Sequence, residues 1–237
     1  MLVLVGTGVN NDITLGGLEE LKKCDKIYAE VYTNPSLKEF LPKLEKAIGK
    51  KIFELEREKV ESSFLIMEAI NKRVALVSGG DPLTATTHIV FVNECRKRNI
   101  PVKVIHNSSI YAAAPARAGL QIYRFGKTAT LVNPRQNYKP TSSLDVIREN
   151  LARNLHTLVL LDTEPAPMGV KAALSQLSEF GQAVVLSKVA SEDEKITYGD
   201  IKTLIERAEE LGGPPFTIIV PAKLHIVEEE YLSWFKL

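Results

Sequence analysis

The sequence predicts two α/β domains, the first with a mainly parallel sheet and the second with a mixed sheet. Short apolar runs alternate with helical stretches through the first half, a pattern typical of a parallel sheet with helices on both faces. In the second half, the strand candidates 183–186 and 195–198 lie close enough to form an antiparallel pair. Residues 107–127 resemble a linker, with an alanine-rich piece that Pro115 interrupts. The expected organisation is an N-terminal α/β domain at residues 1–107, a linker region at 108–127, and a C-terminal α/β domain at 128–237.

The first half contains five strand candidates, each a short and mostly apolar run: residues 2–5, 26–32, 51–55, 74–77 and 102–105. Helix candidates follow the first four strands, at residues 15–23, 37–48, 61–71 and 89–98. Thr14 is placed to cap the first helix, because a threonine hydroxyl can accept a bond from a free N–H of the first turn. Gly49 is placed to end the second, because glycine adopts the left-handed conformation common after a helix.

The second half continues with strand candidates at residues 128–132, 157–161, 183–186, 195–198 and 215–220. Its helix candidates lie at residues 143–154, 168–180 and 226–235, and another ends near Leu211. Asp200 is placed to cap the helix that ends near Leu211. This order of elements contains no internal repeat.

Composition is that of an ordinary globular protein, with 45% apolar and 25% charged residues among 237. A net charge of +1 gives no signal for binding to nucleic acid or to a membrane. The two cysteines, Cys24 and Cys95, lie far apart and outside any metal-binding spacing, so neither a disulfide framework nor a metal site is expected. No stretch has the length of a membrane span or the pattern of a signal peptide. These features predict a cytoplasmic protein.

The segment 78–88, SGGDPLTATTH, is the strongest candidate for a functional site. It follows an apolar strand and precedes a helix, so it lies at the edge where open α/β sheets bind ligands. Gly79 and Gly80 allow positive φ and close approach of the backbone, and Asp81 offers a carboxylate. The alternative is a tight turn in which Asp81 only caps the next helix.

Other motifs exclude several chemistries. The turn Gly6-Thr7-Gly8 lacks the third glycine of a dinucleotide-binding motif. The spacing of a P-loop is also missing. The turn is nevertheless expected to lie close to some ligand. No serine lies in a nucleophile elbow. The four histidines show no metal-binding spacing and are expected to be structural: His88, His106, His156 and His225.

A family resemblance is carried by motifs in a fixed order along the whole chain. They are Gly6-Thr7-Gly8, Gly80-Asp81-Pro82-Leu83, Thr86-Thr87-His88, Ser109-Ile110-Tyr111, Leu155-His156-Thr157-Leu158 and Lys223-Leu224-His225-Ile226-Val227-Glu228. With these motifs the chain resembles the tetrapyrrole methylase-like, class III methyltransferases. Within that class it is most similar to the diphthine synthase family.

This resemblance implies an enzyme that binds S-adenosylmethionine in a cleft between the two domains and releases S-adenosylhomocysteine. It also implies a homodimer whose protein substrate is elongation factor 2, and methylation, to the trimethylated stage, of the amine of a 2-(3-amino-3-carboxypropyl)histidine residue. The positions that the resemblance assigns to the cofactor are Val9, Asp81, Thr84, Ser109, Ile110, Leu161, Val189 and Phe216.

The expected chemistry requires orientation more than acid or base catalysis. An α-amino group has a pKa of about 7.7–8.0, so about a tenth of it is neutral at pH 7 without help from a base. No catalytic acid or base and no metal are therefore predicted. Glu30 and Asp162 are candidates for carboxylates that complement the methylated cation. Two alternatives remain open: a small-molecule methylase of the tetrapyrrole or precorrin type, and a non-catalytic binding protein with the same fold.

Overall fold

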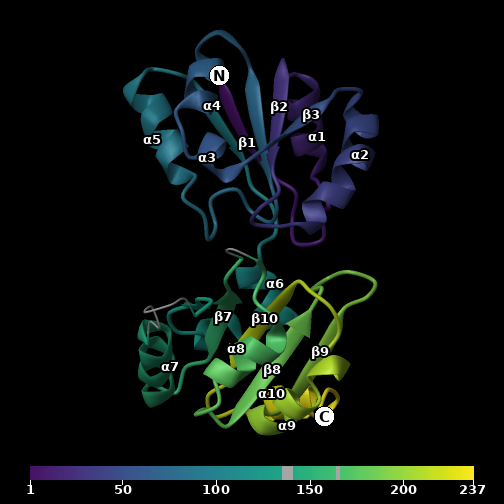
Figure 1. Ribbon diagram of the computed structural model, residues 1–237, viewed down its shortest axis with the longest axis vertical. Helices are drawn as coiled ribbons and strands as arrows, with labels where there is room; N and C mark the ends of the chain where they lie inside the picture. Colours follow the sequence, from purple (N-terminus) through teal and green to yellow (C-terminus); the bar gives the residue numbers. More distant parts are fainter. Residues whose placement is uncertain (135–140, 164–165) are drawn as a thin grey trace. The chain divides into compact units, whose positions relative to one another are not determined.

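The computed structural model describes residues 1–134, 141–163 and 166–237 and divides the chain into two compact units. The first unit is Met1–Ser109 and the second is Ile110–Leu237 (Figure 1). The division falls inside the region expected to be a linker, and much of that region is folded as part of the second unit. Across the described ranges, every helix is too short or too polar to span a bilayer.

The first unit is built on a five-stranded parallel sheet with the order β3-β2-β4-β1-β5. Its strands are β1 (Leu2–Gly6), β2 (Lys26–Glu30), β3 (Ile52–Leu55), β4 (Val74–Ser78) and β5 (Val102–Ile105). Its helices are α1 (Leu15–Lys22), α2 (Ser36–Ile48), α3 (Arg57–Val60), α4 (Phe64–Asn71) and α5 (Ile89–Lys97). The predicted α/β class with a parallel sheet is confirmed.

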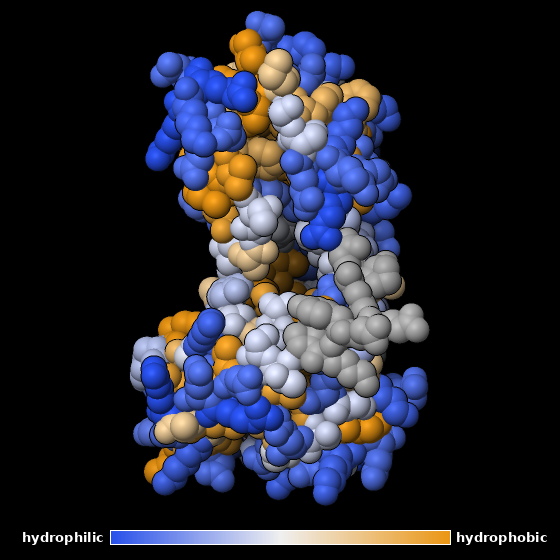
Figure 2. Space-filling model, turned by 60° about the vertical axis from the view of Figure 1, so that its left-hand side comes forward, coloured by the Kyte–Doolittle hydropathy of each residue, from blue (hydrophilic) through white to orange (hydrophobic). Residues whose placement is uncertain are grey.

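Helices cover both faces of this sheet, which explains why its central strands read as continuous apolar runs. Along β1, Leu2 and Leu4 point into the core beneath α4 and α5, whereas Val3 and Val5 point into the core beneath α1 and α2. Figure 1 shows the two groups of helices on opposite sides of the sheet. Apolar residues still reach the surface of the molecule in several places (Figure 2). Among them are Met67, Ile70, Ile89 and Val90, each about half exposed.

The start of α1 and the end of α2 follow the predicted capping signals. Thr14 Oγ1 accepts a hydrogen bond from the backbone N–H of Gly17 at 3.0 Å, and Gly49 has a φ of 70° after α2. The helix expected over 61–71 instead starts at Phe64. The Ser62 hydroxyl accepts the Phe64 N–H at 3.2 Å, a local bond that competes with helix formation.

The second unit is built on a mixed five-stranded sheet with the order β6-β7-β10-β8-β9. In this sheet β6 and β7 pair in parallel, and the other neighbouring strands pair antiparallel. The prediction of a mixed sheet is therefore confirmed. The strands are β6 (Ala129–Leu131), β7 (Thr157–Leu161), β8 (Gln182–Ser187), β9 (Lys195–Asp200) and β10 (Phe216–Val220). The α-helices are α6 (Ile110–Arg117), α7 (Ser142–Ala152), α8 (Val170–Gln176), α9 (Ile201–Glu206) and α10 (Ile226–Ser233). Two short 3-10 helices complete the described part: η1 (Ile122–Arg124) and η2 (Ala208–Glu210).

Three expectations about helices in this unit are corrected. Pro115 does not interrupt the alanine-rich piece but lies within α6, where its missing N–H removes a single bond of the helix. Helix α8 is shorter than the expected 168–180. Asp200 caps α9 by accepting the Lys202 N–H at 2.9 Å, but that helix ends at Glu206 and a 3-10 turn follows.

Candidate active site

The loops that follow β1, β4 and β5 form the candidate site of the first unit. The chain leaves β1 toward β2 and leaves β4 toward β5, so it departs in opposite directions from two neighbouring strands. Such a switch point at the carboxyl ends of parallel strands is the usual place for a ligand in an open α/β sheet. These loops carry Val9, Asp81, Thr84 and Ser109.

The glycines of the first two loops let those loops touch each other. Gly8 and Gly80 exchange two backbone N–H···O bonds, each 3.0 Å long, and both have positive φ, 76° and 66°. A Cβ on Gly6 would lie 2.4 Å from the carbonyl oxygen of Gly80. The contact between the loops therefore explains these glycines without a ligand, and an approach of residues 6–8 to a ligand stays a prediction.

Asp81 is the carboxylate that holds the turn together. Its Oδ1 accepts the Leu83 N–H at 3.0 Å and the Thr84 hydroxyl at 3.1 Å. Its Oδ2 accepts the Asn107 N–H at 3.2 Å and lies 2.8 Å from Nδ1 of His106. Burial alone would raise the pKa of Asp81, but these donors outweigh it and hold the pKa below its usual range. The carboxylate stays ionised and ties the turn to the loop after β5.

Asp81 does not cap the following helix, which is a correction of the simpler alternative. Helix α5 begins only at Ile89, five positions beyond Thr84, the last turn residue that Asp81 binds, and its first turn has no side-chain cap. The Thr86 hydroxyl accepts the His88 N–H at 3.3 Å, so a threonine of the motif does order this approach to the helix.

The remaining predicted residues of the first unit lie in the same loops. The Val9 N–H donates to the Ser108 hydroxyl at 3.1 Å, which joins the loop after β1 to the loop after β5. Among the described residues, the Ser109 hydroxyl has no hydrogen-bond partner and is half-buried. Of the two hydroxyls predicted to contact the cofactor, that of Thr84 donates to Asp81, so that of Ser109 remains available to a ligand.

Asn107 is a structural residue of the site that sequence analysis missed. Its amide nitrogen donates to the carbonyl oxygens of Gly6 and Asp12 at 3.1 and 2.9 Å, and its amide oxygen accepts the Ser108 N–H at 2.8 Å. One side chain thus connects two loops nearly a hundred residues apart in sequence. Its position directly after an apolar strand was the only sequence signal.

The four predicted residues of the second unit fall into two places. Ile110 begins α6. Because Ile218 pairs with Val159 in antiparallel register, Phe216 at the start of β10 lies opposite Leu161 at the end of β7. Phe216 also pairs with Ser187, two residues before Val189. The fold therefore brings Leu161, Val189 and Phe216 together at one end of the sheet.

The two candidate carboxylates for a cationic product already have protein partners. Glu30, at the end of β2, is buried and accepts the Thr33 hydroxyl at 3.0 Å. Asp162, just after β7, accepts the Asn133 N–H at 3.0 Å. Both hold neighbouring loops in place, and their proposed role toward a cation stays a prediction.

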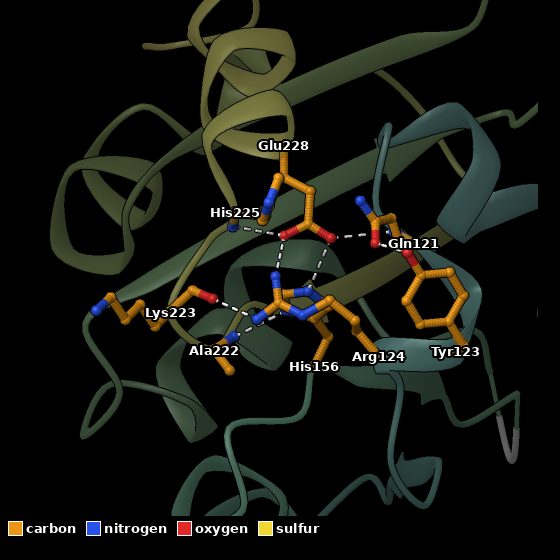
Figure 3. A network of polar contacts seen from close by, with 8 residues as sticks. All are labelled: Gln121, Tyr123, Arg124, His156, Ala222, Lys223, His225 and Glu228. Carbon is orange, nitrogen blue, oxygen red and sulfur yellow. Dashed lines mark hydrogen bonds and ion pairs between the residues drawn. The ribbon is translucent and has the colours of Figure 1, made fainter.

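His156 and Glu228, which belong to the last two motifs, meet in a buried network that is drawn in Figure 3. The Glu228 side chain is 0% exposed and forms an ion pair with Arg124. Its two oxygens also accept the N–H groups of Gln121 at 3.1 Å and of His225 at 2.8 Å. Nε2 of His156 lies 3.4 Å away. Although burial alone would raise the pKa of Glu228, these N–H groups and charges hold it below the usual range.

His156 is fixed in one tautomer by this network. The Ala222 N–H donates to Nδ1 of His156 at 3.0 Å, so Nδ1 is an acceptor and the hydrogen of a neutral ring sits on Nε2, facing Glu228. A proton on Nδ1 would break the bond from Ala222. Burial, the largest cause, lowers the pKa of His156 despite the nearby carboxylate. His156 is therefore a structural histidine, as predicted.

This lowered pKa predicts that stability decreases below about pH 6.5, where an exposed histidine takes up a proton. The unfolded chain then binds a proton that the folded chain refuses, so the free energy of unfolding falls as the pH falls. Urea unfolding at about pH 7.5 and 5.5 measures the drop. We expect a smaller drop in His156→Gln, which lacks the titrating ring. An equal drop in wild type and His156→Gln would contradict the assignment.

Comparison with known proteins places this architecture in a family. The family model for Tetrapyrrole (Corrin/Porphyrin) Methylases matches residues 1–205. The chain belongs to the tetrapyrrole methylase family. Within the family, it is 40% identical over 255 residues to diphthine synthase from Methanocaldococcus jannaschii, covering 99% of this chain and 98% of the relative. Diphthine synthase from Methanothermobacter thermautotrophicus is 38% identical, covering 98% and 94%.

Solved structures of tetrapyrrole methylase relatives agree with this placement. A putative diphthine synthase from Entamoeba histolytica superposes with a TM-score of 0.89 at 35% identity, covering 100% of this chain and 98% of that one. Another diphthine synthase gives 0.88 at 32% identity, covering 99% and 95%. The predictions of this fold, of a methyltransferase and of the diphthine synthase family are confirmed. The small-molecule and non-catalytic alternatives are not favoured.

Proposed function

We propose that the chain transfers methyl groups from S-adenosylmethionine to the amine of the 2-(3-amino-3-carboxypropyl)histidine residue of elongation factor 2, and so forms diphthine. The observation that carries this proposal is similarity to diphthine synthases over nearly the full length of both chains, at 40% identity. The motifs that form the ordered loops after β1, β4 and β5 lie within this similarity. We further propose that the reaction continues to the trimethylated product.

The loops of the first unit fit the polar end of such a cofactor. They present the free hydroxyl of Ser109 and the ionised carboxylate of Asp81, already held in place by four donors. S-adenosylmethionine, when bound, supplies a methyl group activated by a positively charged sulfur. A nearby carboxylate favours that charge. Val9, Asp81, Thr84 and Ser109 are the contacts proposed on this unit.

The residues proposed on the second unit fit its apolar parts. Leu161 and Phe216 are partly buried against the core of the unit, and Val189 is buried beside the same end of the sheet. Apolar side chains of this kind line most small-molecule sites, while a few polar groups set the orientation. Ile110, Leu161, Val189 and Phe216 are the contacts proposed on this unit.

The proposed mechanism is based on orientation. The amine is already partly neutral near pH 7, because α-amino groups have a pKa of about 7.7–8.0. Placing reactants in line can supply effective molarities of about 10⁵–10⁸ M, or roughly 7–11 kcal/mol of the barrier. The role of this chain's residues is then to hold the carboxyl-end loops rigid and to exclude water. The bonds of Asp81 and Asn107 between loops provide that rigidity.

A cytoplasmic homodimer is part of the proposal. The family resemblance supports the dimer, and the two free cysteines, Cys24 and Cys95, are typical of the reducing compartment that the cytoplasm provides. Light scattering coupled to size-exclusion chromatography measures the assembly: a mass of two chains supports it, and a mass of one chain contradicts it.

Intact-mass spectrometry of elongation factor 2 tests the activity. The factor carrying the aminocarboxypropyl-histidine precursor is incubated with this protein and S-adenosylmethionine, and unmodified factor serves as the control. We expect stepwise gains of methyl masses on the precursor alone, ending at three. No gain while S-adenosylhomocysteine still binds would contradict the proposed substrate and favour a small molecule.

A further inference from the structure

His88, the last residue of the SGGDPLTATTH segment, is bonded back to the middle of that segment. The side chain is 3% exposed, and its Nδ1 lies 3.0 Å from the carbonyl oxygen of Pro82. A carbonyl oxygen can only accept, so Nδ1 carries the hydrogen and donates it. This bond connects the start of α5 with the turn that carries Asp81 and Thr84.

The bond acts on the one flexible angle that Pro82 retains. The proline ring fixes φ, so the direction of the carbonyl is set by ψ alone. The same peptide plane is held on its other side, because the Leu83 N–H donates to Asp81 Oδ1 at 3.0 Å. With His88 on the carbonyl and Asp81 on the N–H, both polar groups of the Pro82–Leu83 peptide are fixed.

This turn contains a conformation that needs such support. Ala85 has a φ of 56°, in the left-handed region that residues with a Cβ rarely adopt. Residues held there cost about 1–3 kcal/mol and persist only when surrounding bonds determine the backbone. The bonds made by Asp81 and His88 lie directly before Ala85 and restrict the path that the chain takes into it.

The imidazole itself is held by its surroundings. Its Nε2 faces Glu30 Oε2 at 3.8 Å, and both side chains are buried. That distance is too long for a hydrogen bond, so the directional bond of the ring is the one to Pro82. The Phe91 ring packs against the imidazole with 5.5 Å between centroids. The ring is therefore enclosed between β2 and α5.

We propose that His88 is a positioning residue for methyl transfer, which keeps the Asp81–Thr84 turn in the conformation that receives the cofactor. The inference rests on the proposed function, since it places S-adenosylmethionine at this turn. His88 touches neither cofactor nor substrate in this account. It acts through the Pro82 carbonyl, so any side chain that donates a hydrogen from the position of Nδ1 can replace it.

Replacing His88 by asparagine or by glutamine distinguishes the hydrogen bond to Pro82 from simple packing of the ring. The asparagine side chain carries its N–H group as many bonds from the backbone as Nδ1, whereas that of glutamine lies one bond further. The matched control is Thr87→Ala, at the exposed neighbouring position. Two properties are measured for each folded variant: hydrogen exchange of the Leu83 amide without ligand, and the Kd for S-adenosylhomocysteine by titration calorimetry.

In His88→Gln and His88→Leu, we expect the Leu83 amide hydrogen to exchange about tenfold faster or more. We also expect both variants to bind S-adenosylhomocysteine about tenfold more weakly, which corresponds to about 1.4 kcal/mol of binding free energy. His88→Asn should stay within about threefold of wild type in both, a difference of under 1 kcal/mol. In the methylation assay, KM for S-adenosylmethionine should rise more than kcat falls. Thr87→Ala should match wild type.

Equal exchange in His88→Asn and His88→Gln would overturn the proposal, even if His88→Leu does not fold. So would faster exchange without weaker binding. A wild-type protein that does not bind S-adenosylhomocysteine at all would instead contradict the proposed function, while the exchange rates would still decide whether His88 anchors the turn.

Discussion

Glu228→Ala is expected to lower the free energy of unfolding by about 3–5 kcal/mol, the range for removing one partner of a buried ion pair. The substitution leaves the Arg124 guanidinium without its carboxylate inside the second unit. It also removes the acceptor of the Gln121 and His225 N–H groups, so both lose a partner and α10 loses part of its N-terminal cap.

Urea unfolding measures this loss, with Glu230→Ala as the control on the same helix. Glu230 is exposed, so its removal should change stability by less than about 0.5 kcal/mol. The expected difference between the two variants is therefore several kcal/mol. A Glu228→Ala protein as stable as Glu230→Ala would show that the network does not hold the unit together.

Gly6→Ala is expected to have the second large effect, because it separates the two glycine loops of the candidate site. The new Cβ would lie 2.4 Å from the Gly80 carbonyl oxygen and 2.8 Å from Cδ of Pro82. Inserting a methyl group into such a packed contact costs about 1–3 kcal/mol. The displacement would also move the turn that carries Asp81, so binding of S-adenosylhomocysteine should weaken about tenfold, equivalent to about 1.4 kcal/mol.

Gly16→Ala provides the matched control, since a Cβ there meets nothing within 4 Å. Gly16 is exposed in the first turn of α1, and replacing glycine by alanine at a position with a compatible backbone stabilises a protein by about 0.4–1 kcal/mol. The same substitution is thus predicted to destabilise at one glycine and to stabilise at the other. Thermal unfolding and titration calorimetry of the two variants measure this. A Gly6→Ala protein with unchanged affinity would contradict the assigned role of the loop contact.

The elements of the fold were predictable where one local signal determines them. The apolar run of β1 and the hydroxyl of Thr14 each act over a few residues, and both predictions are confirmed. Helix ends without a side-chain cap were less predictable, as α8 and α9 show. Pro115 was expected to break the alanine-rich piece, but it is the sixth residue of α6 and its missing N–H removes only one bond of that helix.

The site was predictable as a place but not as a set of contacts. A glycine-rich turn after an apolar strand located the carboxyl edge of the sheet. That Asp81 binds His106, or that Arg124 pairs with Glu228, depends on residues 25 and 104 positions apart, which only the tertiary fold brings together. The family motifs contained Asp81 and Glu228, yet the pattern gave no indication of the residues that bind them.

The central claim is that the loops after β1, β4 and β5 receive the cofactor of a methyltransferase. Hydrogen exchange of the wild-type protein, with and without saturating S-adenosylhomocysteine, tests it most directly. We predict that S-adenosylhomocysteine slows exchange in residues 79–85 and 106–110 and leaves the outer strand β3 unchanged. Binding without protection of either segment would contradict the account.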